Sequence, residues 1–224
     1  MSKPFERLEA QRLRREEGLP MKQIAARLGV SPGSVHLWTR DISLTREQQS
    51  RNLRSANEIR AVAWVERHRA RRAKHQLEGR VRAREGRPLH HAGCMLYWAE
   101  GAKDRNTLCF ANSDPAMVAF FGRFLKEEMD VRAEDFKVSL NVYTGNGLSV
   151  VDIEERWLRV LGAPRSCLRG HVLNHYPTST SGRKKNRLPY GVCDLRASKS
   201  TPIVQHIFGA IQEYGGFNEP RWLG

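Results

Sequence analysis

The stretch MKQIAARLGVSPGSVHLWTR, residues 21–40, decides the fold of the N-terminal part of the chain. Residues 21–28 space their apolar side chains as a short helix does, and Gly29 permits the positive φ of a tight turn. Ser31 is placed to cap a following helix that has Pro32 at its first position. A further helix is predicted over residues 4–17, so the first forty residues favour three short helices.

This stretch closely resembles the twenty-residue helix-turn-helix pattern, with Ala25 where two helices touch and Gly29 in the turn. The resemblance implies that the second helix of the pair enters the major groove of DNA. Arg40 can donate two hydrogen bonds to a guanine edge, and the helix N-terminus with Ser31 or Ser34 can bind phosphate. Such units also serve as protein-binding modules, which stays an alternative. The groove-facing positions fall on Ser31, Pro32, Gly33, Ser34, His36, Leu37 and Arg40.

Charge points to a polyanionic partner. The 224 residues contain 38 Lys and Arg against 24 Asp and Glu, which gives a net charge of +14. Residues 1–90 carry 21 of these bases and only 10 of the acids. An anionic membrane surface would also attract such a segment, but no apolar run approaches the roughly 18 residues of a spanning helix. We therefore expect double-stranded DNA as the partner and no membrane.

Targeting and cysteine usage place the protein in the cytoplasm, associated with the nucleoid. The first residues, MSKPFER, are charged and have no apolar run behind them, unlike a signal peptide. The cysteines show no CxxC or other close ligand spacing, so we expect reduced thiols and no structural zinc site. No cofactor is expected to be required for DNA binding. The cysteines are Cys94, Cys109, Cys167 and Cys193.

Residues 45–88 predict a basic helical arm. The segment from 45 to 86 lacks proline and repeats apolar residues at helical spacing, which indicates one long helix or a pair. Its later part is strongly basic, with Glu78 as the single acid between residues 67 and 84. We expect phosphate contacts there, although a solvated charged face is the alternative. The predicted contacts are Arg69, Arg71, Arg72 and Lys74.

After Pro88 the pattern becomes mixed, and the chain is assigned to the α+β class. Helices are expected over residues 89–101, 114–129, 149–161 and 202–214. Strands are expected over 107–111, 136–143, 167–176 and 190–197. This organisation predicts a helix-turn-helix domain at 1–44, the arm at 45–88 and a further domain at 89–224.

The window GCMLYWAEG, residues 93–101, is an apolar helix that ends in a lone carboxylate and a glycine. Ala99, Glu100 and Gly101 resemble the end of the motif helix of the LAGLIDADG homing-endonuclease family, and the order of elements from about 89 to 216 is broadly similar. The resemblance implies a mixed α/β saddle domain in which two motif helices pack together, so one motif per chain implies a homodimer. Met95 stands where the family has a glycine, and Trp98 replaces an acid.

In that family the acidic residues bind divalent metal beside the scissile phosphates, which implies Glu100 as metal ligand and catalytic residue with Mg²⁺. A helix-turn-helix joined to this fold also occurs in bacterial transcription regulators that do not cleave DNA. We therefore favour a dimeric transcriptional regulator, with a metal-dependent endonuclease as the alternative and an interaction scaffold as a third. Phosphate contacts are further predicted for the loop residues Arg183, Lys184, Lys185 and Arg187.

Overall fold

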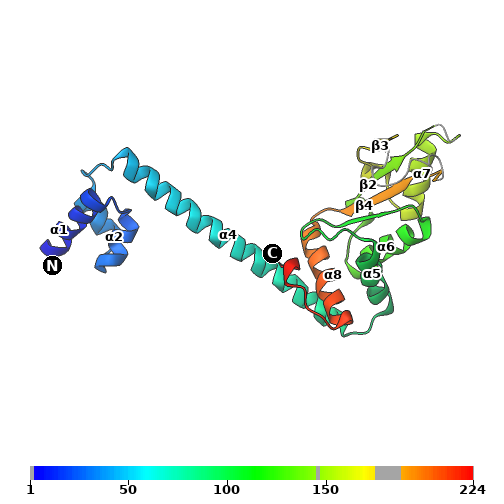
Figure 1. The fold of residues 1–224 in the computed structure, drawn as a ribbon, viewed down its shortest axis with the longest axis horizontal. Coiled ribbons are helices and arrows are strands. Elements are labelled where there is room, and N and C mark those ends of the chain that lie inside the picture. The colour runs from blue at the N-terminus through cyan, green and yellow to red at the C-terminus, as the bar shows by residue number, and fades with distance from the viewer. Residues whose placement is uncertain (1–2, 145–146, 175–187, 224) are drawn as a thin grey trace. The chain divides into compact units, whose positions relative to one another are not determined.

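The computed structural model describes residues 3–144, 147–174 and 188–223. Two compact units, Met1–His68 and Arg69–Gly224, make up the chain. The long helix α4 (Arg46–Ala83) contributes residues to both (Figure 1). Within the described ranges, no helix has the length and apolar character needed to cross a membrane.

The N-terminal unit has the three predicted helices. Leu13, Ile24 and Val35 are fully buried, and each comes from a different helical segment, so together they fix the packing. Gly29 has φ 63° and ends the second helix in the left-handed conformation that the turn requires. The elements are α1 (Pro4–Arg12), a π-helical turn (Leu13–Glu17), α2 (Met21–Leu28) and α3 (Pro32–Thr39).

The start of α4 is docked on the end of the first helix. Gln48 Nε2 donates to the carbonyl of Arg15 at 3.2 Å, and Asn52 Nδ2 donates to that of Gly18 at 2.8 Å. These bonds satisfy carbonyls that a helix end leaves without partners. A reciprocal cap between Thr45 and Gln48 begins α4, so its first turns belong to the N-terminal unit.

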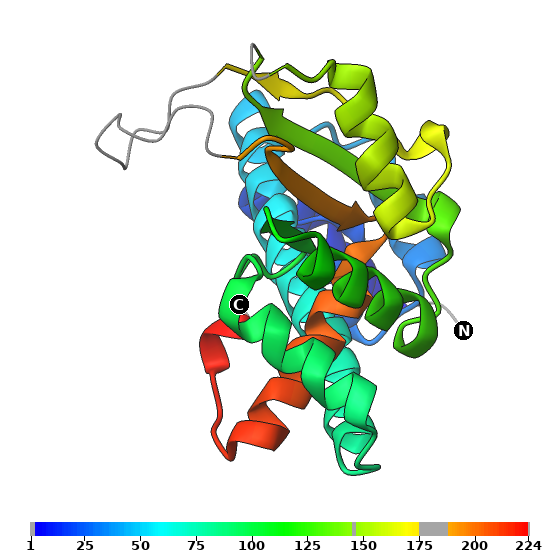
Figure 2. The ribbon, with the colours of Figure 1, turned by 90° about the vertical axis from the view of Figure 1, so that its right-hand side faces the viewer.

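The C-terminal unit is built on a mixed four-stranded sheet in the order β1-β4-β2-β3. The central strands β2 and β4 are antiparallel, as Figure 2 shows in green and brown-orange, while β3 runs parallel to β2. Alternate residues of β2 are buried, so one face of the sheet packs on the core and the other faces outward. The strands are β1 (Cys109–Asn112), β2 (Phe136–Val142), β3 (Val172–Leu173) and β4 (Val192–Ala197).

Four helices complete the core of this unit. Trp157, Tyr97, Phe121 and Phe208 each come from a different helix and are fully buried in a single apolar cluster with the sheet. The α+β class is confirmed, whereas a LAGLIDADG saddle stays a prediction. The helices are α5 (Pro88–Glu100), α6 (Pro115–Glu128), α7 (Val150–Leu161) and α8 (Ser200–Gly215), with 3₁₀ turns at Ala133–Asp135, Arg165–Cys167 and Pro220–Trp222.

The strand expected over residues 167–176 was overestimated. Within the described residues 167–174, Val172–Leu173 pairs as a strand after a 3₁₀ turn, and Leu168 forms an isolated bridge with Val138. Residues 175 and 176 lie outside the described part of the chain. The described pairing is short because the imidazole of His171 accepts a hydrogen bond from the backbone N–H of Leu140 at 3.1 Å, where a longer strand would use its own carbonyl. Glu154 accepts from the other ring nitrogen of His171 at 2.9 Å, which fixes the ring.

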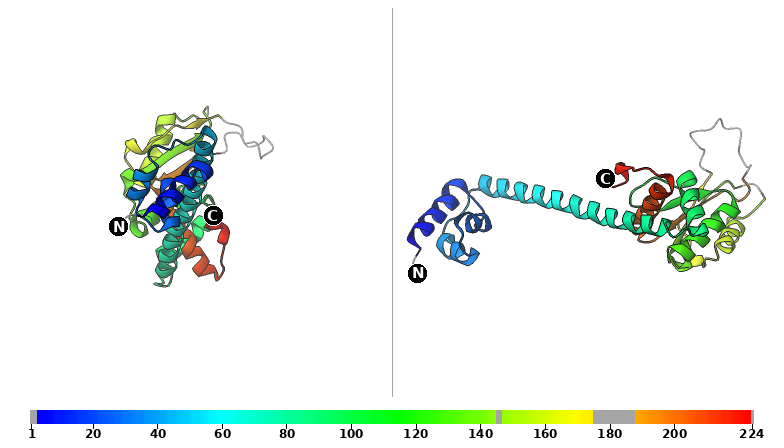
Figure 3. Two further views of the ribbon diagram at one scale, coloured as in Figure 1. Left: turned by 90° about the vertical axis from the view of Figure 1, so that its left-hand side faces the viewer. Right: turned by 90° about the horizontal axis from the view of Figure 1, so that it is seen from below.

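Helices α4 and α8 approach each other at backbone distance within the C-terminal unit (Figure 3). A Cβ on Gly79 would lie 1.9 Å from the carbonyl oxygen of His206, and one on Gly209 would lie 2.0 Å from that of Gln76. The side chain of Gln76 donates to Gln205 at 2.8 Å, and both side chains are buried. Residues 69–83 therefore belong to this unit and pack on it through one side of the helix, whereas the sequence predicted a separate arm over 45–88.

Gly79→Ala should destabilise the C-terminal unit by about 1–3 kcal/mol, because the added methyl group meets a backbone oxygen. Helix propensity alone predicts a gain of about 1 kcal/mol from the same change. Urea unfolding followed by circular dichroism distinguishes the two. Gly33→Ala in α3 is the control, since its Cβ would have only Ser31 Oγ nearby at 3.9 Å, and it should not be destabilising.

A histidine pair, the buried His90 and the half-buried His206, joins α5 to α8. His90 Nε2 and His206 Nε2 lie 2.9 Å apart, and His90 Nδ1 lies 2.8 Å from the hydroxyl of Tyr214. Burial, followed by the proximity of His206, lowers the pKa of His90 to about 4, and burial also lowers the pKa of His206. Both rings are consequently neutral at pH 7.

Stability should fall as the pH decreases from about 6.5 towards 4. In that window the unfolded chain binds a proton at His90 that the folded chain excludes, so the free energy of unfolding falls by up to about 1.4 kcal/mol per pH unit, and the lowered pKa of His206 adds to this slope. Urea titrations at pH 7, 6 and 5 measure the slope. His206→Gln removes one titrating ring and should flatten it; an unchanged slope would contradict the assignment.

Candidate nucleic-acid interface

The first turn of α3 is fixed by its own serines. Ser31 Oγ accepts a hydrogen bond from the backbone N–H of Ser34 at 3.2 Å, and the two hydroxyl oxygens lie 2.9 Å apart. Pro32 occupies the first helical position, as predicted. The Ser31 hydroxyl thus caps the helix and the Ser34 hydroxyl bonds to it, so a phosphate at this N-terminus would meet backbone N–H groups as well as the serines.

One side of α3 is buried and the other is exposed. Val35 and Thr39 are buried, and Trp38 is half-buried against the core. The hydroxyl of Thr39 is satisfied in this position because it donates to the carbonyl of Val35 at 2.7 Å. The exposed side includes Leu37, which keeps 64% of its surface in solvent. Pattern reasoning did not single out Thr39. Of the predicted groove-facing residues, Ser34 is half-buried and the others are exposed: Ser31, Pro32, Gly33, His36, Leu37 and Arg40.

The cations of residues 69–74 have different environments. Arg69, Arg71 and Lys74 are exposed, and the ammonium of Lys74 lies 3.9 Å from Glu78. Arg72 is buried instead, with its Nε donating to the carbonyl of Leu223 at 2.7 Å. Burial and nearby arginines lower the pKa of Arg72. A phosphate contact by Arg72, as predicted, does not fit this buried position. The side chain stabilises the fold instead.

Glu100 is the last residue of α5, and its side chain is exposed. Its carboxylate accepts a long hydrogen bond from Asn112 Nδ2 at 3.4 Å. Lys103 caps the same helix end by donating to the carbonyls of Tyr97 and Gly101, and burial lowers the pKa of Lys103. Among the described residues, no three His, Cys, Asp or Glu side chains gather as metal ligands. One chain therefore does not complete a Mg²⁺ site at Glu100.

The remaining predicted contacts, Arg183, Lys184, Lys185 and Arg187, lie outside the described residues. All four cysteines are free, with Cys109 half-buried and the other three buried, in agreement with the expected thiols.

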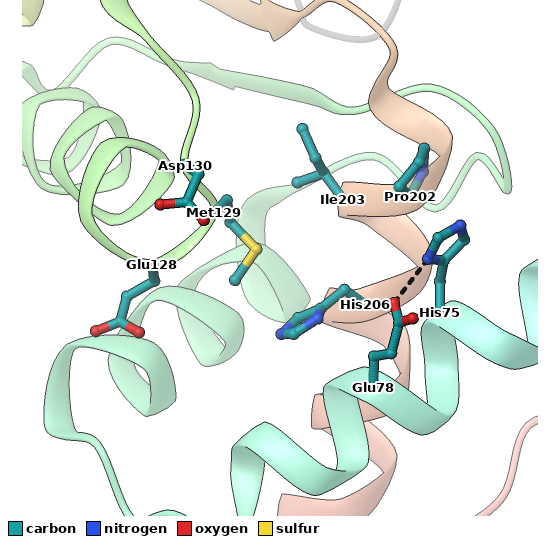
Figure 4. A pocket seen from close by; sticks show the side chains of 8 residues that line it. All are labelled: His75, Glu78, Glu128, Met129, Asp130, Pro202, Ile203 and His206. Carbon is teal, nitrogen blue, oxygen red and sulfur yellow. Dashed lines mark hydrogen bonds and ion pairs between the residues drawn. The ribbon is translucent and has the colours of Figure 1, made fainter.

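The C-terminal unit also contains a cavity of about 290 Å³ between α4, the end of α6 and α8 (Figure 4). His75 Nδ1 lies 2.8 Å from Glu78 on one wall, and His206 projects from α8. Glu128 is almost fully buried and holds Arg87 at 2.9 Å and Arg82 at 3.2 Å. Sequence patterns gave no sign of this cavity, because its lining residues come from three distant segments.

The three-helix core, the turn at Gly29 and the exposed side of α3 define a helix-turn-helix domain of the DNA-binding class. Residues 2–46 match a family model described as a homeodomain-like domain. No curated protein and no solved structure matches the chain. The match supports DNA binding by the N-terminal unit and leaves the residues after 46 without an assigned family.

Arg40→Ala should weaken binding to the preferred DNA site by about 1–3 kcal/mol and relax specificity at one base pair. The side chain of Arg40 is 63% exposed, and its Nε lies 3.7 Å from the exposed carboxylate of Asp41, so the guanidinium is available to a base edge. Binding titrations on the preferred site and its single-base variants measure both effects. Arg12→Ala is the control, because Glu9 and Glu16 engage that guanidinium. Equal losses on every sequence would assign Arg40 to phosphate contact.

Proposed function

We propose that this protein is a sequence-specific DNA-binding regulator of transcription that acts as a homodimer. The observation that carries the proposal is the exposed side of α3 on a helix-turn-helix framework, in a chain of net charge +14. In this class the N-terminal residues of the recognition helix contact base edges, and two subunits bind two half-sites. His36 and Arg40 are the side chains best suited to read bases.

Support for a dimer comes from α5. Ala92, Met95 and Ala99 follow one another at helical spacing, and the two alanines are exposed while Met95 is half-buried. The two alanines allow a second helix to approach closely, while Met95 between them, in place of the family's glycine, makes this contact wider. Self-association through this face agrees with the LAGLIDADG resemblance, in which motif helices pair. Trp98 borders the face and stacks on Phe217 at 5.4 Å.

The outward face of the sheet supports additional DNA contacts. Lys137 and Arg196 are exposed partners on β2 and β4, and Asn141 lies exposed further along β2. Asp194 pairs with Arg196 at 2.8 Å, so Lys137 is the less compensated cation. Together with Arg69 and Lys74, these groups suit backbone contacts that raise affinity without specifying sequence.

The endonuclease alternative is favoured by one observation, the exposure of the Glu100 carboxylate beside Asn112 at the end of α5. A carboxylate is a hard oxygen donor that suits Mg²⁺. Since one chain supplies a single carboxylate there, the alternative needs Glu100 from a second subunit. Regulation needs no such pairing.

A DNA library incubated with the protein, with and without Mg²⁺, should yield an enriched, intact and partly palindromic site. Sequencing of bound and cut molecules measures both outcomes at once. Metal-dependent cuts at a defined site would overturn the regulator and assign the nuclease. Absence of sequence enrichment, with no steep salt dependence of binding, would favour an interaction scaffold.

Glu100→Gln separates the two functions, because it removes the charge and keeps the shape. A regulator binds its site with unchanged affinity after this substitution, whereas a nuclease loses cleavage. Glu127→Gln on the exposed side of α6 is the matched control and should change neither activity.

A further inference from the structure

An aromatic pair, the exposed Trp64 and the half-buried His68, lies on α4 within the N-terminal unit. Trp64 keeps 58% of its surface in solvent, and its ring centroid lies 4.1 Å from that of His68 at an interplanar angle of 43°. Arg60 and Arg67 are one turn before and one turn after Trp64, on the same side of the helix. We define these four residues, Arg60, Trp64, Arg67 and His68, as the Trp64 patch.

The patch is cationic as well as aromatic. Within the described part of the chain, neither Arg60 nor Arg67 forms an ion pair, and Arg60 Nη1 donates only to the amide oxygen of Asn57, at 3.3 Å. A ligand that fits must therefore be anionic and offer a flat surface to the indole. Nucleic acid has both properties, since phosphates alternate with sugars and bases.

Other exposed apolar residues on α4 do not extend the patch into a continuous apolar stripe. Leu53 points within about 20° of Trp64, but it lies about 16 Å before Trp64 along the helix, with the polar Asn57 and Arg60 between them. At 100° per residue, Val65 points about 100° away from Trp64, Ile59 about 140° and Val62 about 160°. A coiled-coil partner or a membrane surface requires one continuous apolar face. The distribution around α4 favours a local contact at Trp64 over either of these.

We propose that the Trp64 patch binds duplex DNA beside the sequence read by α3. The indole stacks on a base or sugar at a deformable step of the duplex, and Arg60 and Arg67 neutralise the flanking phosphates. This inference rests on the proposed DNA-binding function and adds a second contact of the same unit. Trp64 lies 18 residues after the start of α4, about 27 Å along the helix, which corresponds to a reach of about eight base pairs.

The test compares full-length wild type with Trp64→Ala and Trp64→Phe on the DNA enriched by wild type. Loss of one stacking contact should raise Kd about tenfold for Trp64→Ala and less for Trp64→Phe, which keeps a ring. The slope of log Kd against log salt should stay unchanged for Trp64→Ala, whereas Arg67→Ala should reduce its magnitude by about 0.9. Ile59→Ala is the control, because Ile59 is a 62% exposed apolar residue that points about 140° away from Trp64.

A fluorescent adenine analogue, 2-aminopurine, reports unstacking directly. Placed at successive positions within eight base pairs of the α3 site, it should brighten at one position with wild type and not with Trp64→Ala. Equal Kd values for wild type and Trp64→Ala, with no brightening at any position, would overturn the proposal. Reduced self-association of Trp64→Ala at unchanged DNA affinity, or binding to anionic vesicles that depends on Trp64 while DNA affinity does not, would overturn it in favour of those partners.

Failure of the proposed function can be distinguished from failure of the inference about Trp64. If wild type enriches no sequence, the regulator proposal fails, and the same variants are compared on a random-sequence duplex. The proposed DNA contact at Trp64 then still predicts weaker binding by Trp64→Ala than by wild type. Equal affinities would exclude that contact. Unchanged thermal unfolding of Trp64→Ala is expected throughout, because the side chain is exposed.

Discussion

The contact on which the C-terminal unit depends is the backbone approach of α4 to α8 at Gly79 and Gly209. No side chain larger than hydrogen fits at either position, so two helices of opposite character, one highly charged and one apolar, pack together closely. The polar groups of this contact are satisfied by glutamines: Gln212 donates to Gln76, which donates to Gln205. Because buried amides must find partners, this chain of bonds specifies one register of the two helices.

Cationic side chains in this protein serve two purposes that sequence alone does not separate. Arg72 bonds a carbonyl of the C-terminal segment, and Arg82 and Arg87 converge on the buried carboxylate of Glu128. These arginines stabilise the packing, and their guanidinium groups are already engaged by partners within the protein. Lys137 and Arg69 lie on exposed surface and contribute to the field that attracts a polyanion. The net charge of the chain therefore overstates the number of groups that a nucleic acid can reach.

Local signals carried the prediction of the N-terminal unit, because caps, turns and helical spacing are all encoded within a few residues of one another. Ser31, Gly29 and Val35 have the positions that the sequence indicates. The same local rules placed the helices after Pro88 within a few residues.

These local rules failed where distant segments meet: burial of Arg72 depends on residue 223, and the short β3 depends on a side chain, His171, taking the place of a strand carbonyl. The T-x-x-Q cap at Thr45 was readable, and it marks where α4 begins. The role of Glu100 stays a prediction, since it depends on a second molecule.

The His90–His206 contact has a consequence for how the cavity wall behaves. With both rings neutral, the two Nε2 atoms share a single hydrogen, so the tautomer of one ring dictates that of the other. If His90 carries that hydrogen, its Nδ1 accepts from Tyr214 and His206 has its hydrogen on Nδ1; if His206 carries it, His90 donates to Tyr214 and Nδ1 of His206 is an acceptor. Whether His206 offers a donor or an acceptor on the cavity side therefore depends on the tautomer of the buried His90 ring. That tautomer also decides whether the hydroxyl of Tyr214, in the last turn of the same helix, donates or accepts.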